Sequence, residues 1–91
     1  MKVDTRALAA RGLAEIALRG ASLREVMQRD APKLADPRDR ALLMALLSEG
    51  ARWWLRFDAA VDGLLEKSLR HKDPAVHALL VLGLVQLEIL E

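Results

Sequence analysis

The stretch DRALLMALLSEGARWWLRFD, residues 39–58, decides the fold of this chain. At about 100° per residue, its apolar side chains recur in steps of three and four along one face of an α-helix. Arg52 falls nearly opposite the centre of that apolar line. A glycine in the middle of the line lets another helix approach closely. The pattern predicts an amphipathic helix whose core-facing residues are Leu43, Leu47, Gly50, Trp54 and Phe57.

The three aromatic residues of the chain all lie in this stretch, and Arg52 and Arg56 are interleaved with them. Arginines interleaved with aromatic rings can form a platform on which nucleic-acid bases stack. The helical phase instead directs Trp54 and Phe57 into the core and places Trp53 at the boundary, with its ring half buried. A stacking platform requires exposed rings, so burial of the rings distinguishes the two interpretations.

Helix caps and apolar periodicity predict an all-α chain. Apolar residues make up 53% of the sequence, and most are Leu and Ala, which favour helices. Ser22 and Glu25 have the spacing of a capping box, and Asp-Pro pairs at 36–37 and 73–74 are typical helix starts. The five expected helices run from after Asp4 or Thr5 to Gly20, from Ser22 up to Pro32, from Pro37 to about Leu55, from about Phe57 or Asp58 to about Leu69, and from Pro74 to the last residue.

Composition predicts one small domain, residues 1–91, without catalytic chemistry. The net charge of +1 shows no basic excess, although ten Arg stand against four Lys. The absence of Cys excludes disulfides and thiolate metal sites. Isolated glycines offer no phosphate-binding loop, and no arrangement of side chains indicates an activated nucleophile or a metal site at His77. These features favour a binding module over an enzyme.

No targeting or membrane segment is evident in the sequence. The first residues contain an early acid and lack the apolar run of a signal peptide. The longest apolar run, residues 78–85, is shorter than the roughly 20 residues that span a bilayer. We therefore expect a cytoplasmic protein with no membrane partner.

The expected last helix is apolar nearly all round from Ala75 to Val85, which predicts a central position surrounded by the other helices. His77 and Glu88 fall on one edge, either at solvent or in a seam between helices. The other helices should not cover this helix completely. We expect some of the following side chains to be exposed: Leu82, Val85, Ile89 and Leu90.

Three segments carry a family resemblance: TRALAARGLAEIALRGASL (5–23), the stretch 39–58, and PAVHALLVLGLVQLEIL (74–90). In this order they resemble the NusB-like RNA-binding domain, over almost the whole chain. More narrowly, they resemble the N-terminal domain of the Sun/Fmu family of bacterial methyltransferases. That family methylates carbon five of a cytosine in small-subunit ribosomal RNA, using S-adenosylmethionine. The matching positions are Arg6, Ala9, Gly20, Ser22, Leu23, Asp39, Arg40, Leu42, Arg52, Asp58, Leu64, Val76, His77, Gly83 and Gln86.

The resemblance implies ribosomal RNA as partner and a C-terminal catalytic domain that holds S-adenosylmethionine, with no cofactor in this chain. The chain departs from the family pattern at Glu49 and at Val85, without consequence for the fold. The candidate RNA contacts are Lys2, Arg6, Arg40 and Arg52, with Arg11 as a weaker one. The alternative role of each is a solvated surface charge or a salt bridge, and for Arg6 also a structural hydrogen bond.

Two classes of function stay open. The first is an RNA-binding module that presents RNA to a catalytic domain. The second is a protein-interaction module, which either docks on its own catalytic domain or resembles a free NusB-type transcription antitermination factor. A free factor should show a more basic start and a further pair of helices after the last one. This chain shows neither feature, and we therefore favour a fragment of a methyltransferase. Because that pair is absent, we also expect this fragment to form a homodimer through its last helix.

Overall fold

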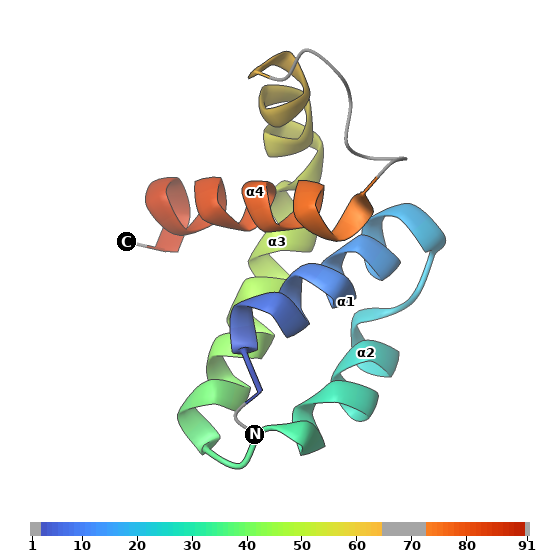
Figure 1. Cartoon of the computed structure of the whole chain (residues 1–91), viewed down its shortest axis with the longest axis vertical. Helices are drawn as coiled ribbons and strands as arrows, with labels where there is room; N and C mark the ends of the chain where they lie inside the picture. Colours follow the sequence, from blue (N-terminus) through green and yellow to red (C-terminus); the bar gives the residue numbers. More distant parts are fainter. Residues whose placement is uncertain (1–2, 65–72, 91) are drawn as a thin grey trace.

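Residues 3–64 and 73–90 are described by a computed structural model of the chain. These residues form four α-helices and two short helical turns and contain no strand, which confirms the all-α prediction (Figure 1). The elements are α1 (Thr5–Arg19), α2 (Leu23–Asp30), the 3₁₀ turn η1 (Ala31–Lys33), α3 (Pro37–Leu64), α4 (Pro74–Val85) and the π-helical turn η2 (Gln86–Leu90).

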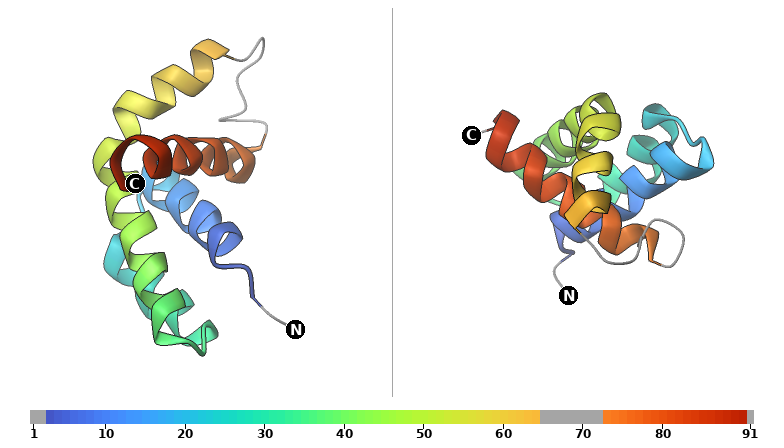
Figure 2. Two further views of the ribbon diagram at one scale, coloured as in Figure 1. Left: turned by 90° about the vertical axis from the view of Figure 1, so that its left-hand side faces the viewer. Right: turned by 90° about the horizontal axis from the view of Figure 1, so that it is seen from above.

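Helix α3 is the longest element, and the other helices are arranged along it. Helices α1, α3 and α4 pack against one another in all three pairs, while α2 makes smaller contacts with α1 and α3. Figure 2 shows α4 lying across α3 near the middle of its length. This arrangement buries one face of α3 and leaves the opposite face to solvent.

The helix starts lie where the capping residues predict them. The Asp4 side chain accepts hydrogen bonds from the backbone N–H groups of the first turn of α1, and Asp73 caps α4 in the same way. The Ser22 hydroxyl accepts from the Glu25 N–H at 3.0 Å, and the Glu25 carboxylate accepts from the Ser22 N–H at 3.3 Å. Gly20 ends α1 with φ of 78°, in the left-handed region that favours glycine.

The prediction of separate helices over 37–55 and 57–69 is wrong, because α3 runs without a break from Pro37 to Leu64. No proline or glycine interrupts residues 51–62. Asp58, which resembled a helix start, lies inside the helix, and its side chain contacts His77 of α4. Residues 65–69 lie outside the described residues.

The core confirms the helical phase deduced from the sequence. Leu43 and Leu47 are fully buried, while Trp54 and Phe57 are 7% and 5% exposed. Trp53 is partly buried and packs against the edge of this core. The aromatic stretch therefore contributes two rings to the interior and one to the boundary.

Gly50 is a point at which α1, α3 and α4 approach one another closely. A Cβ atom placed there would lie 2.8 Å from Leu13 Cδ2 of α1 and 3.0 Å from Leu82 Cδ2 of α4. Ordinary contacts of a Cβ atom lie at 3.4 Å or more. The missing side chain thus allows α1 and α4 to pack on the same turn of α3.

Helix α4 is buried on one side only, so its predicted position at the centre of the bundle is wrong. His77, Ala78 and Val81 face the interior, and Leu82 and Val85 are also buried, contrary to the predicted bare strip. The side chains of residues 89 and 90 are outside the described ones. The outer face of α4 consists of Val76, Leu79, Leu80 and Gly83, and it continues into η2 at Leu87; all five residues are exposed. Self-association through this helix stays a prediction.

Trp54→Ala should lower the free energy of unfolding by about 3–5 kcal/mol, because it removes a large ring from the core. Trp53→Ala should have a clearly smaller effect, because its ring lies at the boundary. Chemical denaturation of both variants measures the difference. If Trp53→Ala were the more damaging substitution, the helical phase of α3 would be wrong.

Gly50→Ala should destabilise the protein by roughly 1–2 kcal/mol, because crowding of Leu13 and Leu82 outweighs the better helix propensity of alanine. Gly83→Ala is the matched control, since nothing lies within 4 Å of its Cβ position. That variant should be more stable than the parent chain by up to about 1 kcal/mol. Urea denaturation of both tests this, and a stabilising Gly50→Ala would contradict the close approach.

Candidate nucleic-acid interface

Four residues on α3 form a cluster around the boundary tryptophan, and we call Glu49, Arg52, Trp53 and Arg56 the Trp53 cluster. The guanidinium carbons of Arg52 and Arg56 lie 5.6 and 6.0 Å from the centroid of the Trp53 ring. Both distances are within the range of cation–π attraction. The indole Nε1 donates a 2.9 Å hydrogen bond to Glu49 Oε2, one helical turn earlier. The ring is therefore fixed in place, with two cations against it.

Arg52 and Arg56 are exposed and carry no carboxylate partner within residues 3–64 and 73–90. Arg56 also lies 5.4 Å from the centroid of the Phe57 ring. Their only interactions there are with aromatic rings, which leave the N–H groups available to an anion. The sequence pointed to Arg52 as a candidate but not to Arg56. The i, i+4 spacing of Glu49 and Trp53 could have indicated a side-chain contact between these two residues and so drawn attention to the arginines beside them.

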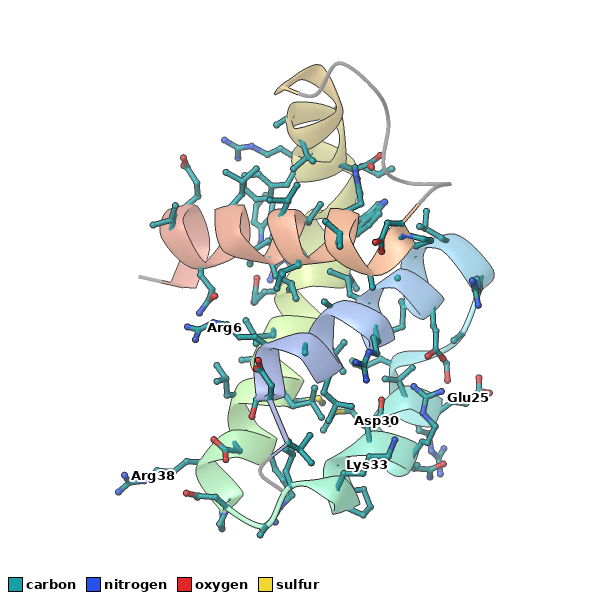
Figure 3. All side chains as sticks on the ribbon, in the orientation of Figure 1. Arg6, Glu25, Asp30, Lys33 and Arg38 are labelled. Carbon is teal, nitrogen blue, oxygen red and sulfur yellow. The ribbon has the colours of Figure 1, made fainter. Side chains whose placement is uncertain are left out.

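Arg6 lies between the start of α1 and the end of α4 (Figure 3). Its Nε atom donates a 3.1 Å hydrogen bond to Gln86 Oε1, which joins two elements 80 positions apart in sequence. This is the structural hydrogen bond that the sequence left open as the alternative for this residue. Arg6 remains exposed, so the rest of its guanidinium group is accessible from solvent.

Arg40 is held at the start of α3 by backbone acceptors. Its Nη1 atom donates to the carbonyl oxygens of Leu34 and Ala35 at 2.7 and 3.0 Å. These bonds close the turn between η1 and α3. Arg40 therefore has a structural role, and only the remainder of its guanidinium is available to a ligand.

The candidate residues do not converge on one patch. Arg40 and Arg52 are separated by twelve positions of one helix, which is about 18 Å along its axis. Arg6 lines a different surface cavity of about 360 Å³, together with Asp4 and Asp39. Two carboxylates beside one arginine make that cavity a poor phosphate site. Lys2 lies outside the described residues.

Arg11 and Arg19 line a second cavity, of about 250 Å³, between α1 and the start of α4. Glu15 and Asp73 also contribute to its wall. Glu15 is bound by Arg29, with Nη1–Oε2 and Nη2–Oε1 distances of 2.7 and 2.9 Å. Glu15 follows Arg11 by four positions, a spacing that allows a salt bridge within α1, but its carboxylate pairs with Arg29 of α2 instead.

A buried polar pair joins α3 to α4. His77 Nε2 and Asp58 Oδ1 are 2.7 Å apart, and the His77 side chain is 0% exposed. The His77 ring also lies 5.7 Å from the Trp54 ring, centroid to centroid. Because the imidazole is sealed from solvent, the pair serves packing between helices and not chemistry on a substrate. Its partners are 19 positions apart, so no local pattern in the sequence indicated it.

Neither a metal cluster nor a membrane span is found in the described part of the chain. No group of three or more His, Asp or Glu side chains converges there. No described helix is both long enough and apolar enough to cross a bilayer.

A charged network fastens α2 to α1. Asp30, at the end of α2, is only 1% exposed and accepts from Arg29 Nε and Nη2 at 2.9 and 2.8 Å. Lys33 Nζ lies 3.0 Å from Asp30 Oδ1, and Figure 3 shows both residues at this end of the bundle. The hydrogen bonds from Arg29, reinforced by Lys33, hold the pKa of the Asp30 carboxyl below its usual value.

Asp30→Asn should lower the free energy of unfolding by about 1–3 kcal/mol at neutral pH, because it weakens a buried ionic network. A depressed folded-state pKa contributes stability above about pH 4, and that contribution is lost as the pH falls through the folded-state value. The stabilities of the two proteins should therefore converge in acid. Urea denaturation at neutral and acid pH measures this. Glu88→Gln, at an exposed carboxylate, is the control that should show no such convergence.

The fold and the surface together define a small all-α domain with an arginine-flanked ring on its longest helix. The chain matches the NusB family over residues 3–91 and belongs to that family. It is similar to "Ribosomal RNA small subunit methyltransferase B" of Xanthomonas campestris pv. campestris, with 37% identity over 89 residues. The protein of the same name from Pseudomonas putida is 39% identical over 85 residues.

These alignments cover 98% and 93% of this chain but 20% and 19% of the two relatives. The chain therefore spans about a fifth of the length of the curated relatives it matches. No solved structure matches the chain.

Proposed function

We propose that this domain binds small-subunit ribosomal RNA and helps an S-adenosylmethionine-dependent cytosine-C5 methyltransferase domain to engage it. The observation that carries the proposal is the match of nearly the whole chain to relatives named as ribosomal RNA methyltransferases. The alignment covers one fifth of those relatives, which leaves room for a separate catalytic domain. In this proposal the domain recognises RNA and performs no catalysis, and the protein works in the cytoplasm.

S-adenosylmethionine, the cofactor implied by the family resemblance, does not fit the residues described here. The cavity at the start of α1 is lined by Asp4 and Asp39, and the one at the start of α4 by Glu15 and Asp73. Neither offers a glycine-rich turn that could approach a nucleoside closely. In this proposal the cofactor belongs to the catalytic domain.

RNA binding by this domain depends on local groups of arginines, since the net charge is only +1. Arg52 is the strongest of the four candidates, because it is exposed and has no carboxylate partner in the described ranges. Arg6 and Arg40 are partly committed to Gln86 and to backbone carbonyls, and Lys2 is proposed from the family resemblance alone. With few phosphates contacted, affinity should be weak.

A second role, in protein docking, is favoured by the outer face of α4 and η2. Leu79 and Leu80 of α4 are 44% and 42% exposed, and Leu87 of η2 is 67% exposed. Large apolar side chains gathered on one face are typical of a surface that another protein covers. The protein's own catalytic domain, a second copy of this chain, or the partner of an antitermination factor would each suit this role.

Arg52→Ala should weaken binding of a small-subunit ribosomal RNA hairpin without unfolding the protein. Each phosphate contact contributes roughly one unit to the slope of log K against log salt. We expect Arg52→Ala to reduce that slope by about one unit, and Lys2→Ala to act similarly. Fluorescence anisotropy titrations at several salt concentrations measure both quantities.

Arg38→Ala is the matched control, because Arg38 lies on the same helix and projects away from the body of the molecule (Figure 3). It should leave affinity and slope nearly unchanged. Equal losses in all three variants would show that the domain binds RNA only through diffuse charge. No binding by the parent chain at low salt would contradict the proposed function.

A further inference from the structure

We propose that the Trp53 cluster binds one unpaired nucleotide of the RNA, with the base stacked on an arginine that itself lies against the indole. The inference rests on the proposed RNA binding and names the part of the RNA that this site recognises. It assigns roles to Glu49, Trp53 and Arg56 as well as to Arg52.

The first argument is the geometry of the arginines. An exposed arginine normally samples many rotamers, and ordering it on a ligand costs free energy. Here the two guanidinium carbons lie 5.6 and 6.0 Å from one ring centroid, and the ring is anchored by its hydrogen bond to Glu49. Both cations are thus held close to the positions in which they would meet a ligand. Reduced ordering on binding favours affinity.

The second argument is the kind of surface that the cluster presents. Trp53 is partly buried against the core, so part of the indole itself is withdrawn from ligands. A guanidinium group is planar and stacks on bases as aromatic side chains do. The cluster can therefore still stack on a base, although not through an exposed aromatic ring. The arginine contacts the base, and Trp53 lies behind the arginine and supports it.

The third argument is the apolar surface beside the cluster. Leu55 is 85% exposed, three positions from Arg52 on the same outer face of α3. The neighbouring outward residues Ala59 and Ala60 are exposed as well. A site for phosphate alone gains nothing from an apolar neighbour, whereas a base or ribose can pack on Leu55. The combination favours a whole nucleotide over an isolated anion.

These features select unpaired RNA over a duplex. In a double helix the base faces are covered by their neighbours, and only phosphates and the groove edges are offered to protein. An unpaired loop nucleotide presents both a free base face and a phosphate. One arginine can then stack while the other binds the phosphate. Glu49 accepts from the indole N–H, yet its charge still opposes an approaching phosphate.

The test compares an RNA hairpin carrying an unpaired loop with a fully paired duplex of the same stem. Trp53→Leu keeps an apolar contact with the core and removes the support for the arginines. We expect about tenfold weaker binding of the hairpin, the usual scale of a lost base-stacking contact, and nearly unchanged binding of the duplex. Trp54 is retained in this variant, and its fluorescence together with helical circular dichroism reports that the domain is folded.

Glu49→Gln provides a second variant with the opposite expected sign. Glutamine can still accept the indole hydrogen bond, but the negative charge beside the bound phosphate is gone. Hairpin affinity should rise by roughly two- to threefold, on the scale of one screened charge near the surface. A purely structural role of Glu49 would give no gain. Arg38→Gln, outside the cluster, should change neither RNA affinity.

The outcomes separate this inference from the function on which it rests. Hairpin binding that is unchanged in both Trp53→Leu and Glu49→Gln would overturn the nucleotide site while leaving RNA binding intact. Equal loss of hairpin and duplex affinity in Trp53→Leu would show a phosphate patch without base stacking and would also overturn it. If the parent chain bound polyglutamate as tightly as the hairpin, the cluster would be a general anion surface, and the nucleotide site would be overturned. Absence of all RNA binding would remove both proposals.

Discussion

The close approach at Gly50 is the constraint on which the rest of the structure depends. Leu13 of α1 and Leu82 of α4 both reach the turn of α3 from which a side chain is missing. A Cβ atom there would crowd the side chains of both leucines. Because two helices meet on the same turn, one face of α3 is fully covered. None of the described helices packs on the opposite face, and Arg52 and Leu55 of that face are exposed to solvent.

Much of this arrangement follows from local sequence. Asp4, Ser22 and Asp73 are capping residues whose effect extends over one turn, so helix starts could be predicted within a residue or two. The apolar period of α3 also fixed which rings are buried, because 100° per residue leaves Trp54 and Trp53 on different sides of the boundary.

What could not be predicted depends on contacts between distant residues. Asp58 resembles a helix start until its partner is known, and the partner, His77, is 19 positions away on another helix. The exposed side of α4 could not be predicted either, because a helix with apolar residues all round shows no preferred face in its sequence. In the candidate site, Arg52 could be named from its position opposite the core. The sequence could not show that Arg6 and Arg40 are engaged in hydrogen bonds, because their partners, Gln86 and two backbone carbonyls, are brought close only by the fold.

The distribution of acids explains how a chain of net charge +1 can hold two neighbouring arginines that have no carboxylate partner in the described ranges. Many acidic side chains in the described ranges are engaged locally: three cap helices, one completes a capping box, two bind Arg29, one contacts His77 and one accepts from the Trp53 indole. Net charge counts each of them against an arginine, although several lie far from the arginines of the Trp53 cluster. A phosphate responds to charges within about 10 Å at physiological salt and not to the sum over the molecule. For a domain of this kind, the pairing state of each arginine is therefore a better guide to nucleic-acid binding than the total charge, and by that measure Arg52 and Arg56 stand apart from Arg29, Arg40 and Arg6.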